Sequence, residues 1–258
     1  MTTTVKDVLG IVEKIAPFGA ADSWDCSGLR IGSTATVVSK IAVSLDPSVE
    51  VIERAAKDGC NLLITHHPVA FKGLKNAVYD NNLDCKIIKA AFVNGVDVIS
   101  CHTNVDNTLL NLDLAMMFGL TPSRPLEVVS EFGFGAGVFC ESKTPVEVEK
   151  FCAKVAKVLN LSGYQLYGDT SEVTNISICG GSGGDLWKNV LDQHKMLYIT
   201  ADLDYHDRIY AIDSGVSVML CDHGEMEEPP FKEFYKRLNG ILPVESKFYN
   251  RTTNVKYY

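Results

Sequence analysis

The chain has 258 residues, 46% of them hydrophobic and 22% charged, a composition typical of globular proteins with a buried core and unlike that of disordered or coiled-coil chains. Its 24 basic and 32 acidic residues give a net charge of −8, which would repel a phosphate backbone, so nucleic acid is not an expected partner. The longest apolar runs, 61–65 and 216–221, are shorter than the roughly 20 residues that span a bilayer, so no membrane association is expected.

The first ten residues include Lys6 and Asp7 and lack the apolar stretch of a secretory signal, which indicates a cytoplasmic protein. The cysteines are scattered singly, without a Cys-x-x-Cys pair and mostly within apolar runs. This pattern favours reduced core thiols over disulfides. The residues concerned are Cys26, Cys60, Cys85, Cys101, Cys140, Cys152, Cys179 and Cys221.

The first predicted element is a helix from Val5 to Ile15, where valine, leucine and isoleucine recur at helical spacing. Thr4 and Asp7 form a capping box at its start, and Pro17 stops it.

A strand–helix–strand unit follows. We expect a strand at 41–45, then a helix capped by Asp46 with Pro47 at its first position and Gly59 beyond its end, then a strand at 62–65. A second amphipathic stretch around 87–91 leads to a further strand at 96–101.

The second half of the chain repeats this order. Strands are expected at 175–179, 196–200 and 216–221; a glycine-rich turn at 180–184 and a helix through Leu186 and Val190 follow the first, and a helix at 207–214 precedes the last. Thr200 then corresponds to Thr65, and Cys221 to Cys101.

Between the halves, 121–174 is predicted to be a connecting segment. It contains a strand at 135–140 and a helix with Thr144 as cap, Pro145 at its first position and Glu147 completing the capping box. The predicted fold is α/β, with two pseudo-repeated, interlocked halves (1–120 and 175–258) and helices covering both sheet faces, forming a single compact unit over 1–258.

Histidines cluster at the carboxyl ends of the predicted strands, where open α/β sheets place ligand sites. His66 and His67 follow one strand and His102 the next, and His223 follows the strand at 216–221. Adjacent side chains of an extended chain point to opposite sides, so His66 and His67 should serve two different ions. On a helix, His223 and Glu227 would share one face, as metal ligands four residues apart commonly do.

Asp106 would complete this set as a bridging carboxylate between two divalent ions, which repel each other unless bridged. Such a pair activates water as a nucleophile near neutral pH. Imidazole and carboxylate ligands suit Zn, Mn, Fe, Co or Ni. A lone histidine at a strand end more often caps backbone groups, and Asp106 alone could equally form an Asx turn or a helix cap. Five such residues at corresponding strand ends together favour a metal-binding site.

Several motifs, in this order, resemble the Ngg-one interacting factor three-like family, whose bacterial members are labelled GTP cyclohydrolase I type 2 homologues. They are Trp24-Asp25-Cys26-Ser27-Gly28-Leu29, Thr65-His66-His67-Pro68, His102-Thr103-Asn104-Val105-Asp106, Ile199-Thr200-Ala201-Asp202, and His223 with Glu227. The resemblance covers nearly the whole chain. It implies a dinuclear metal centre held by His66, His67, Asp106, His223 and Glu227, with Glu225 as the alternative to the last.

The resemblance also implies a homohexameric ring, a trimer of dimers with the sites facing an inner cavity, and a short form without the domain that longer relatives insert mid-chain. The chain departs from the family pattern at three positions. It has Cys26 where the family often has Asn, Asp222 where Gly is usual, and Tyr205-His206 where a His pair is frequent. None of these removes an implied ligand, but the departures leave the substrate contacts at those positions open.

Other polar groups have smaller expected roles. His102 is expected to orient Asp106 or a substrate rather than to bind metal. His206 and Asp202 are candidates for the same pocket. The turn at 180–184 could bind a phosphate but lacks the lysine and hydroxyl of a P-loop, so an ordinary flexible turn is favoured. Trp24 and Asp25 could shape the pocket rim, although a buried tryptophan beside a capped turn is the simpler interpretation.

Two functions fit these residues, and no catalytic side chain can be assigned within either. The first is a metal-dependent hydrolase that acts on a small polar or nucleotide-like substrate through a metal-bridging water. The alternative is a non-catalytic protein that stores or delivers metal or binds other proteins.

Overall fold

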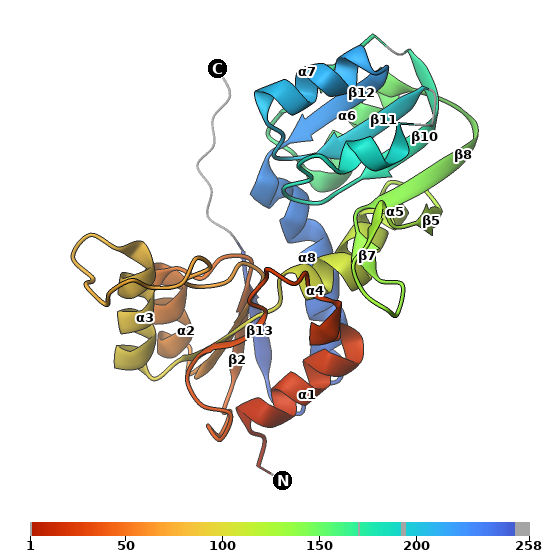
Figure 1. Ribbon diagram of the computed structural model, residues 1–258. Helices are drawn as coiled ribbons and strands as arrows, with labels where there is room; N and C mark the ends of the chain where they lie inside the picture. The colour runs from red at the N-terminus through yellow and green to blue at the C-terminus, as the bar shows by residue number, and fades with distance from the viewer. Residues whose placement is uncertain (1, 170, 192–194, 251–258) are drawn as a thin grey trace. The chain divides into compact units, whose positions relative to one another are not determined.

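The computed structural model describes residues 2–169, 171–191 and 195–250. These residues form two compact units (Figure 1). The first comprises 2–105 and 231–250, and the second comprises the described residues of 106–230. The units divide at Val105/Asp106 and Pro230/Phe231, and the second unit is inserted into the sequence of the first. The division into 1–120, 121–174 and 175–258 stays a prediction. A single compact unit over 1–258 stays a prediction.

The first unit is built on a five-stranded sheet in the order β1-β4-β3-β2-β13. Its strands are β1 (Gly28–Ile31), β2 (Ile41–Ser44), β3 (Leu62–Thr65), β4 (Asp97–Ser100) and β13 (Ser246–Tyr249). Strands β2, β3, β4 and β13 run parallel, and β1 closes the edge beside β4 antiparallel to it. Strands β2 and β3 are buried along their whole length, as parallel strands covered on both faces must be.

Helices cover both faces of this sheet: α2 (Val49–Lys57) and α3 (Leu83–Asn94) lie on one side, and α1 (Val5–Ile15) on the other (Figure 1). The capping box at Thr4 and Asp7 is confirmed, with both reciprocal hydrogen bonds present. Helix α2, however, is capped by Ser48, whose hydroxyl accepts from Val51 N–H at 3.1 Å, and not by Asp46. The Asp46 carboxylate is used elsewhere, as described below.

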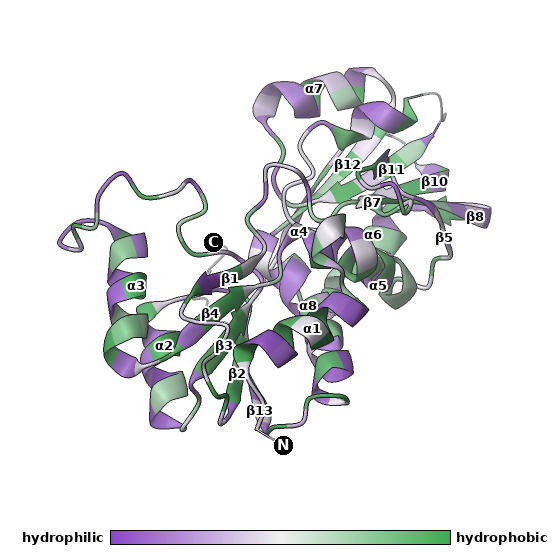
Figure 2. Ribbon diagram, turned by 60° about the horizontal axis from the view of Figure 1, so that its bottom comes forward, coloured by the Kyte–Doolittle hydropathy of each residue, from purple (hydrophilic) through white to green (hydrophobic). Residues whose placement is uncertain are grey.

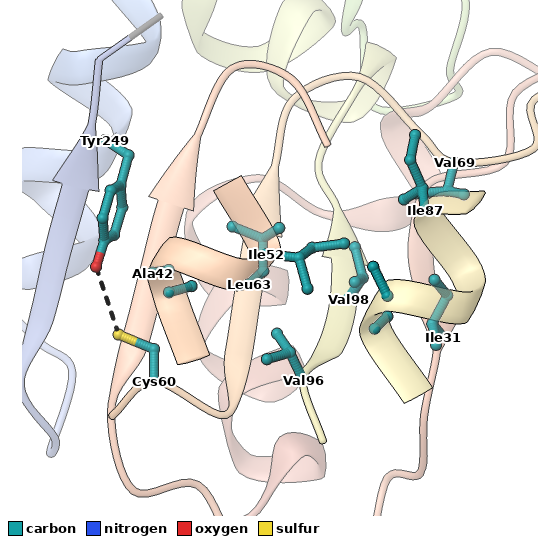
Figure 3. Packing of buried hydrophobic residues seen from close by; sticks show 13 residues of the cluster. Ile31, Ala42, Ile52, Cys60, Leu63, Val69, Ile87, Val96, Val98 and Tyr249 are labelled. Atoms are coloured by element: carbon teal, nitrogen blue, oxygen red, sulfur yellow. Dashed lines mark hydrogen bonds between the residues drawn. The ribbon is translucent and has the colours of Figure 1, made fainter. Parts of the chain in front are cut away.

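The core between the sheet and helices α2 and α3 is apolar and closely packed (Figure 3). Ile52 of α2 and Ile87 of α3 pack with Leu63 of β3 and Val98 of β4. Strands β2 and β3 are largely green in Figure 2, which marks their residues as hydrophobic.

Strand β13 adds a polar contact to this core. The hydroxyl of Tyr249, a residue with 1% of its surface exposed, donates to the Asp58 carboxylate at 2.6 Å and lies 4.0 Å from Cys60 Sγ (Figure 3).

The second unit contains a six-stranded sheet in the order β5-β8-β10-β11-β12-β9. Its strands are β5 (Pro122–Arg124), β8 (Val138–Glu147), β9 (Tyr164–Tyr167), β10 (Glu172–Ile178), β11 (Met196–Thr200) and β12 (Val216–Cys221), and a separate hairpin pairs β6 (Glu127–Val128) with β7 (Gly135–Ala136). Strands β10, β11 and β12 run parallel. The described α-helices that lie wholly within this unit are α5 (Asn111–Met117), α6 (Val148–Leu159) and α7 (Tyr205–Asp213), and a π-helical turn at Asp106–Leu110 precedes α5.

The expected repeat is confirmed in the sheets. Three parallel strands form the centre of each unit, β2-β3-β4 in the first and β10-β11-β12 in the second, and an antiparallel strand flanks the last of them in each, β1 beside β4 and β9 beside β12. Thr65 and Thr200 end the corresponding strands β3 and β11. The α/β fold class is therefore confirmed.

Two predicted helices differ from the structure. Thr144 and Pro145 lie in strand β8, and α6 begins only at Val148. Pairing of Val146 with Val173 and of Glu147 with Glu172 extends the strand, and this long-range ladder outweighs the local capping signal. The segment Leu186–Val190 is a 3-10 helix, not an α-helix.

The last helix, α8 (His223–Asn239), contains Pro229 and Pro230, and the two units divide within it. The described helices include none long and apolar enough to cross a membrane. All eight cysteines are free, seven of them buried and Cys26 half-buried, as the sequence predicted.

Candidate metal centre

In the first unit, His66 and His67 follow β3 at a bend in the chain. Backbone N–H groups of both residues donate to the Leu45 carbonyl, at 3.1 and 3.0 Å, and the Thr65 hydroxyl donates to the His67 carbonyl at 2.8 Å. The rings lie on the same side, with centroids 5.0 Å apart. The expectation that they point to opposite sides is therefore wrong, because the extended geometry on which it depends ends at Thr65.

His102, which follows β4, joins this pair. One ligand-capable atom from each of His66, His67 and His102 lies within 4.8 Å of the others, so the three could hold a metal ion. The sequence had assigned His102 a supporting role, whereas the structure places it among the candidate ligands of the first unit.

The Nδ1 atom of each of these rings meets an oxygen acceptor. His66 Nδ1 lies 2.9 Å from the Cys101 carbonyl oxygen, His67 Nδ1 lies 2.7 Å from Asp46 Oδ1, and His102 Nδ1 lies 2.9 Å from Asp25 Oδ1. Carbonyl and carboxylate oxygens can only accept, so Nδ1 carries the proton. In the neutral imidazole the lone pair is then on Nε2, the state in which a histidine binds metal.

The Asp25 carboxylate accepts several hydrogen bonds. Its side chain is fully buried and accepts from Ser27 Oγ at 2.6 Å and Thr103 Oγ1 at 2.7 Å, in addition to His102. Burial by itself would raise the pKa of Asp25, but hydrogen bonds from His102, Ser27 and Thr103 outweigh it and hold the pKa well below its usual range. Asp25 is therefore ionised at neutral pH, and its carboxylate fixes the His102 ring.

Aromatic rings border His102. Trp24, with 62% of its surface exposed, lies edge-on to Phe71 and to His102, at centroid distances of 5.8 and 6.3 Å. The simpler interpretation of Trp24 as a core residue is wrong, and the ring forms part of a rim beside the histidines.

In the second unit, His223 and Glu227 occupy the first turns of α8. His223 Nε2 and Glu227 Oε2 lie 3.1 Å apart, close to the roughly 3.3 Å between two ligand atoms of a tetrahedral zinc ion with bonds of about 2.0 Å. His223 Nδ1 contacts Asp202 Oδ2 at 2.7 Å, so this histidine repeats the pattern of the other three.

The alternative ligand Glu225 is turned to another partner. Its carboxylate accepts from the Ser162 backbone N–H at 2.7 Å and from the Ser162 hydroxyl. Asp222, where the family pattern has glycine, accepts from the Glu225 N–H at 3.0 Å and so caps α8. Glu227, and not Glu225, is therefore the carboxylate beside His223.

Gly181 forms the surface against which this pair packs. A Cβ atom at this position would lie 2.1 Å from Glu227 Oε1 and 3.1 Å from His223 Nε2, and the residue has a φ of +65°. Only glycine allows both the left-handed backbone and this close approach. The glycine-rich turn therefore packs directly against His223 and Glu227.

Asp106 opens the π-helical turn, a rare conformation that is frequent at functional sites. Its carbonyl accepts from Asn111 Nδ2 at 3.0 Å, while Asn111 Oδ1 accepts from the Gly180 N–H at 2.8 Å. Asn111, with only 2% of its surface exposed, thus links the backbone of Asp106 to the turn that carries Gly181.

Thiolate ligands do not contribute to these groups. Burial raises the pKa of Cys152 and of Cys221 to about 12, so these thiols stay protonated at neutral pH.

His206 packs against Tyr205 and Tyr210, and it is absent from the candidate metal-binding groups among the described residues.

Sequence reasoning missed Asp46, Gly181 and Asn111. Asp46 and Asp202 each lie two residues beyond the end of a parallel strand, β2 and β11 respectively. The rule that ligand sites lie at the carboxyl ends of parallel strands could therefore have identified both carboxylates as partners of the histidines. No local signal marks Asn111, because its two hydrogen bonds depend on the tertiary fold.

Comparison with known proteins places the chain in a family. The family described as Duf34/NIF3 (NGG1p interacting factor 3) matches residues 3–255. The chain is 29% identical over 249 residues to the "GTP cyclohydrolase 1 type 2 homolog" of Clostridium acetobutylicum, covering 94% of this chain and 92% of that protein. It is 28% identical over 239 residues to the "Protein NIF3 homolog" of Schizosaccharomyces pombe, covering 86% and 84%.

A hypothetical protein of Staphylococcus aureus has the same fold in its crystal structure, with a TM-score of 0.87, 22% identity and full coverage of both chains. These findings confirm the resemblance drawn from the sequence motifs. The chain belongs to the Duf34/NIF3 family.

Proposed function

We propose that this protein is a metal-dependent hydrolase that uses two divalent cations bound by His66, His67, Asp106, His223 and Glu227. The observation that carries the proposal is the shared pattern at the histidines. His66, His67 and His223 each have Nδ1 against a carbonyl or carboxylate oxygen. Metal-ligating histidines almost always have such a partner, which leaves Nε2 for the ion.

The donor set fits the cations named from the sequence. Imidazole and carboxylate groups without thiolate suit Zn, Mn, Fe, Co or Ni. Glu227 and His223 lie so close to Gly181 that any side chain there would displace them. This constraint supports their interpretation as a pair of metal ligands rather than an ordinary surface ion pair.

When bound, a pair of such cations would supply a nucleophilic water near neutral pH and polarise the bond under attack. The chain's own groups would orient the reaction. Asp25 holds the His102 ring, and Trp24 and Phe71 border that ring on the exposed side. A small polar or nucleotide-like substrate is proposed, supported by the GTP cyclohydrolase label that relatives carry.

The test begins with metal content. The purified protein, never exposed to chelator, is analysed by elemental mass spectrometry and loaded with Zn, Mn, Fe or Co to two ions per chain. It is then screened against phosphoesters, purine nucleotides and amides. We expect turnover that is lost on chelation and in Glu227→Gln together with metal. Two bound ions without turnover in any class would favour the alternative, a metal-storage or delivery protein, and absence of bound metal would refute both.

We also propose a homohexamer, a trimer of dimers, and a cytoplasmic location. The family relationship supports the first, and the free cysteines, which suit a reducing compartment, support the second. Native mass spectrometry should give six chains per particle, and a monomer or dimer at micromolar concentration would exclude the ring.

A further inference from the structure

A pocket in the second unit adjoins Asp106. Its volume is about 280 Å³ and its wall includes Asp106 and Asn107 of the π-helical turn, Ser123 and Arg124 of β5, and Phe134 before β7. This volume is at the lower limit for small-molecule sites, so the pocket suits a small group or one end of a larger ligand. The pocket is formed by residues of the second unit alone.

Among the residues that the structure describes, Arg124 is the single cationic residue of the pocket wall. Its guanidinium lies over the ring of Phe139, 5.0 Å from the centroid, and Nη1 donates to the Pro125 carbonyl at 3.3 Å. Stacking and this bond hold the planar group in place, while a guanidinium has five N–H donors in all. The remaining donors suit a planar or tetrahedral oxyanion.

Other parts of the pocket wall are formed by glycines, which contribute backbone atoms and no side chain. At Gly135 a Cβ atom would lie 2.7 Å from the Pro125 Cβ, and at Gly137, with a φ of +60°, it would lie 2.6 Å from Leu126 Cδ1. These glycines keep the hairpin strands β6 and β7 close to the segment that carries Arg124. A side chain at either position would force that segment to move.

We infer that this pocket binds a phosphate group of the substrate, with Arg124 as the residue that selects it. The inference rests on the proposed function, because Asp106 borders the same pocket and its negative charge would repel a phosphate unless a bound cation neutralised it. Phosphate binding should therefore require metal. Arg124 is a specificity-determining residue and takes no part in holding the cation.

The experiment uses the full chain loaded with Mn, with metal content measured first. Inorganic phosphate is titrated by calorimetry into the wild type, Arg124→Gln and Arg124→Lys, and acetate is titrated in parallel. Arg208→Gln is the matched control, because Arg208 also stacks on an aromatic ring, 4.4 Å from the Tyr167 centroid, but lies outside the pocket wall.

We expect Arg124→Gln to weaken phosphate binding about 10- to 100-fold, the effect of losing a charge-assisted hydrogen bond. Arg124→Lys should show an intermediate loss, because it keeps the charge but not the fork. Arg208→Gln should match the wild type, and acetate should bind more weakly than phosphate throughout. Metal content should be equal in all variants.

Equal phosphate affinity in wild type and Arg124→Gln at full metal loading would overturn the inference and leave the proposed function intact. Tighter binding of acetate than of phosphate would assign the pocket to carboxylates and overturn the choice of phosphate. A protein that binds no metal would instead refute the proposed function, so the two failures can be told apart.

Discussion

Replacing Gly181 with alanine should weaken metal binding in a way that follows from one distance. The added Cβ would lie 2.1 Å from Glu227 Oε1, whereas ordinary contact begins at 3.4 Å. The carboxylate, the backbone or both must therefore move by about 1 Å in total. A misplacement of about 1 Å can reduce enzyme activity about 100-fold. Removing a residue that orients a metal ligand reduces metal affinity or activity about 10- to 100-fold. We therefore expect a loss of metal affinity of about 10- to 100-fold.

The same substitution also introduces backbone strain, because Gly181 has a φ of +65°. An alanine in this left-handed conformation costs about 1 to 2 kcal/mol of stability, independent of any contact. Gly184→Ala separates the two effects, since Gly184 has a φ of +47° and an added Cβ there would meet nothing within 4 Å.

The assay is competition for Zn²⁺ against a chromophoric chelator, with thermal unfolding measured in excess EDTA. Without metal, Gly181→Ala should lose at least as much stability as Gly184→Ala, but only Gly181→Ala should lose metal affinity. Equal metal affinities in the two variants would refute the argument that Gly181 makes room for the Glu227–His223 pair.

Three further predictions concern supporting residues. Asn111→Ala should lower metal affinity about 10-fold, because it removes the two hydrogen bonds that connect the Asp106 backbone to Gly180. The same zinc competition assay measures this, and an unchanged affinity would show that Asn111 does not position Asp106. Asp25 has a pKa lowered on folding, so its stabilising effect is present above the unfolded pKa of about 3.9 and is lost as pH falls through the folded value. Urea unfolding should therefore find Asp25→Asn less stable than wild type at pH 6, with the gap narrowing below about pH 4, and a gap independent of pH would contradict this assignment. Tyr249→Phe should reduce stability by about 1 kcal/mol through loss of the bond to Asp58, and no change in the urea midpoint would show that this partly buried bond contributes nothing.

The sequence was sufficient for elements that depend on local signals. The Thr4–Asp7 capping box places α1, and unbroken apolar runs place β2, β3, β11 and β12. The histidines could be located at strand ends because the rule for parallel sheets depends only on where a strand stops.

Elements that depend on distant partners could not be predicted in this way. Thr144 and Pro145 read as a helix start, yet pairing of β8 with β10 holds them in a strand. Asp46 reads as a helix cap, yet its carboxylate accepts from His67. In the first case the tertiary pairing outweighs the local signal, and in the second Ser48 caps the helix, which leaves the Asp46 carboxylate for His67.

The position of β13 in the sheet of the first unit determines the order in which the two units can complete folding. Strand β13 pairs with β2, although about two hundred residues separate them along the chain and the whole second unit is synthesised in between. During translation the second unit can reach its final contacts while the first still waits for an edge of its sheet. We therefore expect late emergence of the C-terminal strand to limit the folding rate, and a nascent chain arrested before it to be vulnerable to proteolysis only outside 106–230.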